Sequence, residues 1–184
     1  MSEDAIPDIP HEWLSREDEI CFAERLERLR WLEKQMPPAD YLKYHGGLMS
    51  KYLFDETRYS FVYGQYLAVI VLGVAFIEKM LAAEFYASGR NDLERAGISE
   101  LLKEAGELAW LSADEYDAFE RARQIRNPVT HFRRPLHRED IDRRMVEENQ
   151  LAYTIIEQDA RTIIAAVMHM IGRHAVYVDE SDEQ

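Results

Sequence analysis

The stretch from Thr57 to Ala87 constrains the fold of this chain more than any other. Its apolar residues recur at steps of three and four positions, the spacing of one face of an α-helix. They are Leu67, Ile70, Val71, Val74, Ile77, Leu81 and Phe85. The β-branched cluster AVIVLGV could instead form a buried strand. Since strands seldom exceed about 8 residues and the continuation IEKMLAAEFY is amphipathic, the length favours one long core helix.

Helical spacing also predicts the elements on either side of this stretch. Further helices are expected from about Trp13 to the stop at Pro37-Pro38, over residues 99–108, from Ser112 onward, and over about 141–174. Ser112 and Glu115 have the spacing of a capping box, and Gly46-Gly47 predicts a turn. We therefore expect an all-α bundle of about five to six helices.

Length and composition suit one domain. A chain of 184 residues, 47% of them hydrophobic, can bury a single core. We expect that domain at residues 13–176, between disordered acidic tails at 1–12 and 177–184. The longest apolar run, Tyr66 to Ile77, has 12 residues and is shorter than the roughly 20 that span a bilayer. With Cys21 as the only cysteine, these features predict a soluble cytoplasmic protein without a membrane contact.

Charge is segregated along the chain. The formal net charge of -13 argues against a protein that coats nucleic acid. Residues 120–144 nevertheless hold eight arginines against four acidic residues. The planar arginine fork donates paired hydrogen bonds to phosphate or carboxylate, which favours oriented anion binding. Alternatively, the flanking arginines pair with the surplus of Asp and Glu elsewhere. They are Arg133, Arg134, Arg138, Arg143 and Arg144.

The segment RNPVTH, residues 126–131, carries the candidate chemistry. Histidine, with an ordinary pKa of ~6.5, is the side chain suited to moving protons near neutral pH. A fixed arginine can stabilise charge that builds on phosphoryl oxygens. Arg126 and His131 are therefore candidates for a functional pair, and Asn127 could orient the histidine or the phosphate. The alternative is that Arg126 and His131 only brace the bundle.

This segment resembles the R-x4–6-H motif of the HEPN superfamily, in which a polar residue commonly follows the arginine; Arg126, Asn127 and His131 match it. The helical core, about residues 57–175, is similar more weakly. The resemblance implies a metal-independent endoribonuclease without a cofactor. It also implies a homodimer in which the two motifs face one cleft. The biological role it implies is in a bacterial toxin or defence system, with an antitoxin-like partner. RNA or a nucleotide would be the ligand, and additional phosphate contacts would come from Arg123, Arg133 and Arg134.

Pro128 predicts a break in the motif helix. Proline removes a backbone donor and disfavours helix in the preceding residue, so Asn127 would be an N-cap and Pro128 a first helical residue. In an unbroken helix, Arg126 and His131 lie about 140° apart. A break at Asn127 could bring them together and aim free N–H groups at an anion.

Glu78 is a candidate supporting residue in the core helix. A buried carboxylate needs a partner, so Glu78 could bond Arg126 across the bundle; equally, it could lie at the solvent edge with Lys79. Two other functional classes stay open on the sequence. One is a non-catalytic HEPN-like module that binds a nucleotide or a protein, and the other is a helical interaction protein whose acidic surface binds a basic partner.

Overall fold

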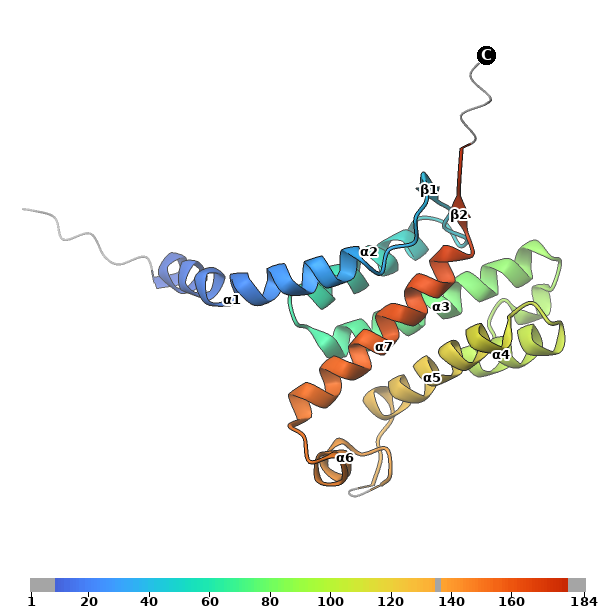
Figure 1. The fold of residues 1–184 in the computed structure, drawn as a ribbon. Helices are drawn as coiled ribbons and strands as arrows, with labels where there is room; N and C mark the ends of the chain where they lie inside the picture. The colour runs from blue at the N-terminus through green and yellow to red at the C-terminus, as the bar shows by residue number, and fades with distance from the viewer. Residues whose placement is uncertain (1–8, 135–136, 179–184) are drawn as a thin grey trace, which may run out of the picture.

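The computed structural model describes residues 9–134 and 137–178, and within them the chain is an all-α bundle (Figure 1). Its α-helices are α1 (Ile9–Glu33), α2 (Leu48–Val62), α3 (Tyr66–Ala87), α4 (Ile98–Glu107), α5 (Ala113–Thr130), α6 (Ile141–Glu148) and α7 (Ala152–Gly172). A 3₁₀ turn, η1 (Asn91–Leu93), precedes α4, and two short strands, β1 (Tyr41–Leu42) and β2 (Ala175–Val176), pair antiparallel. The prediction of an all-α fold is confirmed.

Helix α3 forms the centre of the core, as its apolar pattern predicts. Val74, Phe76 and Ile77 on this helix are fully buried, and α2, α5 and α7 surround it. Gly73 permits close approach of α3 and α7, because a Cβ at this position would collide with Ile163. By length and composition α3 could also cross a membrane. This is weak evidence for a span, since a buried core helix satisfies the same criteria.

Two of the predicted long helices are each divided in two. The helix expected over residues 57–87 is interrupted at Gly64, which has φ 72°, a left-handed conformation that glycine adopts without strain. The chain turns there, so α2 and α3 form an antiparallel pair. The helix expected over 141–174 ends at Asn149, with φ 51°, before α7 begins. The expectation of uninterrupted helices at these two places is wrong, because apolar spacing continues across both turns.

The ends of the described chain differ from the expected tails. Helix α1 begins at Ile9, so residues 9–12 are helical instead of disordered, and residues 1–8 lie outside the described part. Tyr177 and Val178 are exposed as expected for a tail. The Val178 N–H donates to the Asp40 carboxylate at 2.6 Å. The remainder of the expected C-terminal tail, residues 179–184, lies outside the described residues.

Only the C-terminal half of α1 packs on the bundle. Leu32 is buried, and the Arg28 side chain donates to the Val62 carbonyl at 2.8 Å. The Arg161 guanidinium of α7 lies 4.7 Å from the ring centre of Trp31, a cation–π contact. The N-terminal half of α1 extends away from the other helices (Figure 1).

Candidate functional site

Helix α5 carries the RNPVTH motif in its last turns. Ser112 and Glu115 form the predicted capping box, with the Ser112 Oγ accepting from the Glu115 N–H at 3.3 Å and the Glu115 carboxylate accepting from the Ser112 N–H at 2.7 Å. Phe119 and Ala122 are fully buried and fix the helix against the core. The capped start and the buried face together define which side of α5 meets the bundle.

Pro128 does not break this helix, so the prediction of a restart at Asn127 is wrong. Helix α5 continues through Pro128 to Thr130. Proline lacks the N–H that would bond to the carbonyl of Gln124, so one backbone hydrogen bond is lost. Only Val129 and Thr130 follow Pro128 in the helix, so few further bonds depend on its geometry. His131 has extended dihedrals and closes the helix, with its N–H bonding to the Asn127 carbonyl at 2.9 Å. The backbone groups left free at this end are therefore carbonyls, and the expected N–H cradle for an anion is absent.

Arg126 lies within helix α5, and His131 follows its last residue. Side chains five positions apart on a continuous α-helix diverge by about 140°. Arg126 is half-buried, whereas His131 is exposed beyond the last turn. Among the described residues, no hydrogen bond joins the two side chains. The joint action of Arg126 and His131 on one phosphate stays a prediction.

Asn127 and Arg123 interact with each other and with Glu120. The Arg123 guanidinium makes two hydrogen bonds to Glu120, at 2.7 and 2.6 Å. These hydrogen bonds raise the pKa of Arg123 and lower the pKa of Glu120. With its amide oriented to satisfy both groups, Asn127 accepts from Arg123 at 3.0 Å and donates to the Arg123 carbonyl at 3.2 Å. Two of the predicted site residues therefore hold one another on the surface of α5.

The other arginines of residues 120–144 divide into paired and unpaired groups. Arg133 binds Glu139 at 2.9 Å, and Arg144 binds both Glu148 at 3.0 Å and Asp159. Arg138 and Arg143 also contact carboxylates. In the described part of the chain, the guanidinium groups without a hydrogen-bonding or ionic partner in this stretch are those of Arg121, Arg126 and Arg134. The expectation that flanking arginines pair with acidic residues thus holds for most of them.

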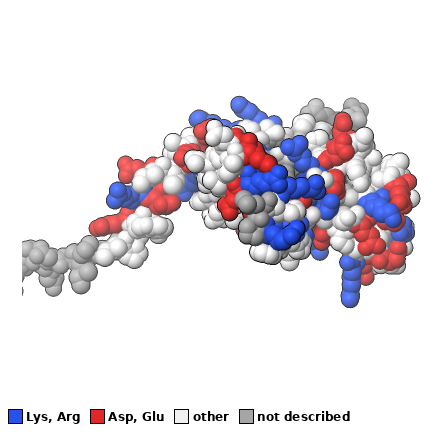
Figure 2. All heavy atoms as spheres, turned by 90° about the horizontal axis from the view of Figure 1, so that it is seen from below, with Lys and Arg blue, Asp and Glu red and all other residues white. Residues whose placement is uncertain are grey.

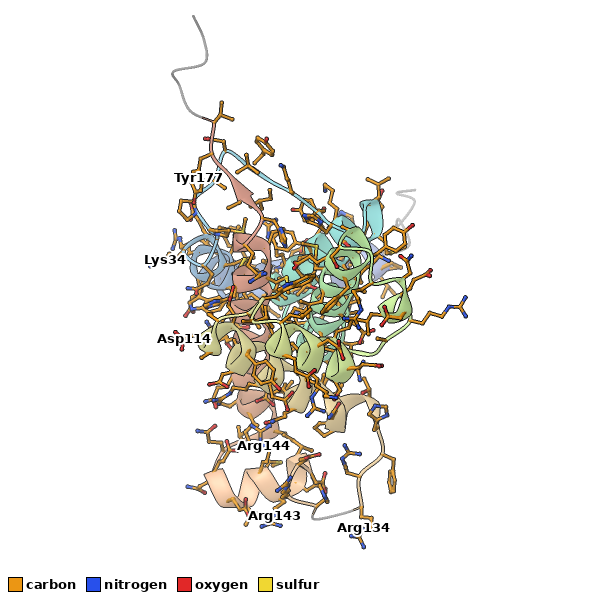
Figure 3. All side chains as sticks on the ribbon, turned by 90° about the vertical axis from the view of Figure 1, so that its right-hand side faces the viewer. Lys34, Asp114, Arg134, Arg143, Arg144 and Tyr177 are labelled. Carbon is orange, nitrogen blue, oxygen red and sulfur yellow. The ribbon has the colours of Figure 1, made fainter. Side chains whose placement is uncertain are left out.

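These arginines gather at one end of the molecule. Arg134, Arg143 and Arg144 lie around α6 and the loop before it, opposite Tyr177 (Figure 3). Seen from that end, Lys and Arg side chains cluster with acidic groups among them (Figure 2). The arginines that gather in the sequence therefore also gather in space, with carboxylates among them.

Glu78 is half-buried, as is Lys79, and its hydrogen-bond partner lies on α4. Its carboxylate accepts a hydrogen bond at 3.0 Å from the N–H of Ile98, the first residue of α4. A carboxylate at a helix N-terminus satisfies a free donor and opposes the positive end of the helix dipole. Glu78 therefore fixes α4 against α3. The predicted bond to Arg126 is not formed.

A hollow of about 400 Å³ lies beside the motif, between α3, α5, α6 and the start of α7. We refer to it as the apolar groove. Its apolar lining is Leu67, Ile70, Ile125, Pro128, Val129, Phe132, Ile141 and Ile156. Phe132 is 87% exposed, although it is aromatic. Neither Arg126 nor His131 lines the groove.

Sequence reasoning did not anticipate an ionic network at the opposite end of α5. Arg173, which follows α7, donates to Glu115 at 2.9 Å and to the Trp110 carbonyl at 3.2 Å. The Glu84 carboxylate of α3 lies 3.6 Å from the Arg173 guanidinium. Its other oxygen is hydrogen-bonded to the His174 Nε2 at 2.8 Å. No local pattern signals these pairs, because their members lie 58 to 90 positions apart. The network joins α3, α5 and the chain after α7.

The aromatic side chains of residues 52–66 are divided between the core and the surface. Phe54, Phe61 and Tyr66 are buried, whereas Tyr52 and Tyr59 are more than half exposed. Within the described residues, no group of His, Cys, Asp and Glu side chains is placed to hold a metal ion. Comparison with protein-family models, curated proteins and solved structures finds no match to this chain.

Proposed function

We propose that the chain is a HEPN-like, metal-independent endoribonuclease, with Arg126 and His131 as its catalytic residues. The observation that supports the proposal is the state of Arg126. Arg126 is half-buried, and its guanidinium has no partner among the described residues, although the chain holds 35 acidic residues against 22 basic ones. An unpaired, partly desolvated cation in so acidic a chain is suited to an external anion, and the fork of arginine fits phosphate.

The proposed reaction uses the RNA's own 2'-hydroxyl as nucleophile. As the 2'-oxygen bonds to phosphorus, the bond from phosphorus to the 5'-oxygen breaks, leaving a 2',3'-cyclic phosphate and a 5'-hydroxyl. The proton of the 2'-hydroxyl leaves and the 5'-oxygen gains one, and His131 would carry out proton transfer. Arg126 would stabilise the charge on the phosphoryl oxygens. Asn127 would act as a positioning residue for Arg123.

The positions of Arg126 within α5 and of His131 after its last residue favour a homodimer as the active form. On a regular helix positions 126 and 131 would lie about 140° apart, and His131 follows the last helical residue; we therefore propose that a single scissile phosphate takes the two groups from different copies. A homodimer with the two motifs facing one cleft would supply Arg126 from one copy and His131 from the other. This dimer is part of the proposal.

A non-catalytic module that binds a nucleotide or a protein is the second candidate. Two observations favour it. Helix α5 runs through the motif without the break that was expected to bring Arg126 and His131 together, and the net charge of -13 repels RNA at long range. In this reading Arg126 and Arg134 would hold a single phosphate group without chemistry.

The two candidates differ in one measurement, cleavage of RNA in the presence of EDTA. We expect the wild type to cut and to leave a 2',3'-cyclic phosphate. The variants Arg126→Ala and His131→Ala should each lose activity by about 100-fold or more, as expected for loss of a proton-transfer or charge-stabilising group. The matched control is Arg143→Ala, because Arg143 is exposed and pairs with Glu147 at 2.6 Å.

Thermal unfolding of the same variants separates chemistry from folding. Equal midpoints for wild type, Arg126→Ala and His131→Ala would assign their activity losses to the site. A wild type that is inert on varied RNAs but binds a nucleotide, with Arg126→Ala abolishing binding, would replace the enzyme by the second candidate. Lower midpoints without any nucleic-acid effect would assign both residues to bracing the bundle.

We also propose a cytoplasmic toxin or defence role, restrained by an antitoxin-like protein. Expression in a bacterial host provides the measurement. The wild type should arrest growth and His131→Ala should not, and equal growth of the two strains would contradict this role.

A further inference from the structure

The N-terminal part of α1, residues 9–24, projects beyond the bundle, and we refer to it as the arm. Apart from Cys21, every residue of the arm is exposed. The arm leads away from the other helices in two perpendicular views (Figures 1 and 2). Its large apolar side chains are each more than half exposed: Ile9, Trp13, Leu14, Ile20 and Phe22. Exposed apolar groups gathered on one helix in this way indicate an interaction surface.

One face of the arm has the spacing of a coiled-coil seam. Ile9, Trp13, Arg16, Ile20 and Ala23 follow one another at steps of four, three, four and three positions. Positions a and d of a heptad repeat have this spacing, and they form the strip that meets a second helix. All five residues are exposed. We refer to this strip as the seam.

The seam ends where α1 reaches its own bundle. The next position of the repeat is Glu27, and the residue after it, Arg28, is buried and donates to the Val62 carbonyl. Helix α1 thus consists of a part that packs on the bundle and a part whose apolar strip is uncovered. Isolated helices shorter than about 12–15 residues are marginal in water, because most helical stability comes from packing. A second helix on the seam would supply the packing that the arm lacks.

The charges beside the seam determine which helix can cover it. Positions e and g of a heptad repeat flank the a and d positions, and charged residues there select the partner. On the arm, the four flanking positions between residues 12 and 24 are all glutamate: Glu12, Glu17, Glu19 and Glu24. A second arm would place glutamates against glutamates, which is unfavourable. A helix with lysine or arginine at its own e and g positions would instead form ion pairs along both sides of the seam.

The same charges argue against a nucleic acid or an anionic membrane as the partner. Residues 9–24 hold five carboxylates against the single arginine Arg16. Phosphate backbones and anionic headgroups repel such a surface. Arg16 lies within the seam, where a single cation fixes the register of a coiled coil and needs an acceptor on the opposing helix.

We propose that the arm forms a coiled coil with a basic amphipathic helix of a different protein. Trp13 and Ile20 contact the apolar strip of that helix, and Glu12 and Glu19 pair with its lysines or arginines. The contact does not involve Arg126, His131 or ribonuclease activity, so this proposal and the proposed function can fail independently.

Two synthetic peptides test this pairing with the purified full chain. Both have leucine at the a and d positions over about three heptads; the basic peptide has lysine at e and g, and the acidic peptide has glutamate there. In isothermal titration calorimetry the basic peptide should bind the wild type, and the acidic peptide should bind at least about tenfold more weakly. Salt should weaken binding of the basic peptide, because it screens exposed ion pairs. Equal affinities, or no binding of the basic peptide, would overturn the proposal.

Reversal of the charges beside the seam should reverse the preference. Glu12→Lys combined with Glu19→Lys should weaken binding of the basic peptide by at least about tenfold and strengthen binding of the acidic one. The matched control is Glu94→Lys combined with Glu107→Lys, which changes the net charge equally at exposed positions outside the arm. An equal loss in the two double variants would mean that the peptide responds only to overall charge, which contradicts the pairing.

Two single substitutions locate the contact. Trp13→Ala should weaken binding of the basic peptide by at least about tenfold, since buried aromatic anchors dominate interface energies. Phe132→Ala, in the apolar groove, should leave the affinity unchanged. Both side chains are exposed, so the fold should survive, as unfolding midpoints will check. Loss of binding in Phe132→Ala but not in Trp13→Ala would place the peptide in the apolar groove and overturn the proposal.

Analytical ultracentrifugation without peptide distinguishes this contact from pairing of two arms. Because the flanking glutamates repel one another, Trp13→Ala should sediment with the same mass as the wild type. A smaller mass for Trp13→Ala would show that arms pair with each other, and the proposal of a different basic partner would be wrong.

Discussion

Glu115 stabilises the protein through two neighbours at once. Burial raises the pKa of its carboxyl, but hydrogen bonds from the Ser112 N–H, Arg173 and the Ser112 hydroxyl outweigh that effect and hold the pKa below its ordinary value of 4.5. A carboxyl with a lowered pKa in the folded state contributes stability above its unfolded pKa and loses it as the pH falls through the folded value. This contribution should therefore be complete at neutral pH.

The variant Glu115→Gln tests the contribution by denaturant unfolding at several pH values. At pH 7 its free energy of unfolding should be lower than that of the wild type by roughly 1–3 kcal/mol, the range for hydrogen bonds to charged groups. The deficit should begin to shrink below about pH 4.5, as the wild-type carboxyl takes up a proton. Glu107→Gln serves as the control, because Glu107 is exposed and lies 3.8 Å from Lys103. A deficit that is constant with pH would contradict the assignment.

Individual residues of the site were predictable where their role is local. The Ser112–Glu115 capping box follows from its spacing, and the structure forms it. Partners across helices were not predictable. Glu78 binds the start of α4 instead of Arg126, because which donor reaches a carboxylate depends on how two helices pack.

The turns between helices depend on left-handed residues. Gly64 has φ 72° between α2 and α3, and Ala109 has φ 53° between α4 and α5. Glycine adopts this conformation without a steric cost, whereas a residue with a Cβ pays about 1–2 kcal/mol. A Cβ at position 64 would also lie 3.3 Å from the Tyr153 hydroxyl.

Two substitutions at these turns should act in opposite directions. Gly64→Ala should lower the free energy of unfolding by roughly 1–2 kcal/mol, whereas Ala109→Gly should raise it by up to about 1 kcal/mol by relieving strain. Thermal unfolding of both proteins at one pH measures the difference. Each variant is the control for the other, and a change of the same sign in both would contradict this account of the turns.

At the scale of elements, periodicity predicted helices but not all of their limits. Apolar spacing runs across Gly64 and Asn149, so the sequence shows continuous patterns where the chain turns. Pro128 had the opposite effect. It suggested a boundary where none exists, because a proline three residues from a helix end costs only one backbone hydrogen bond.

The separation of charge over the whole molecule determines how RNA binding should respond to salt. In residues 120–144, as far as they are described, only Arg121, Arg126 and Arg134 lack partners. Each phosphate neutralised on a single strand contributes a slope of about -0.7 to the dependence of log K on log salt concentration. Two or three such contacts give a slope of roughly -2 at most in magnitude. Salt also screens the repulsion between RNA and the acidic surface, which makes the slope shallower.

Fluorescence anisotropy of a labelled single-stranded RNA between low and physiological salt measures this slope. Arg134→Ala should reduce its magnitude by about 0.7, whereas Arg143→Ala should leave it unchanged. A slope steeper than about -4 would mean that the paired arginines release their carboxylates to bind RNA. This result would contradict the division of the arginines into paired and unpaired groups.

At the scale of the whole molecule, the fold class was predictable but the assembly of its parts was not. The exposed N-terminal half of α1 and the apolar groove depend on where α1 leaves the bundle and where α6 lies. The ionic network of Arg173, Glu84 and Glu115 likewise joins positions far apart in the chain. Such contacts depend on three-dimensional packing, for which one sequence carries no local pattern.

The pairing of β1 with β2 gives the molecule a defined response to tension. Tyr41 pairs with Val176 and Leu42 with Ala175. Because the strands are antiparallel, the chain toward the N-terminus and the chain toward the C-terminus leave the strand pair at the same end. A pull applied at residues 40 and 178 therefore loads the bonds in sequence, first Val178 N–H to Asp40, then Asp40 N–H to Val176, and then Lys43 N–H to His174. The small sheet would open like a zipper at low force, and α2 through α7 would be stretched only after it had parted.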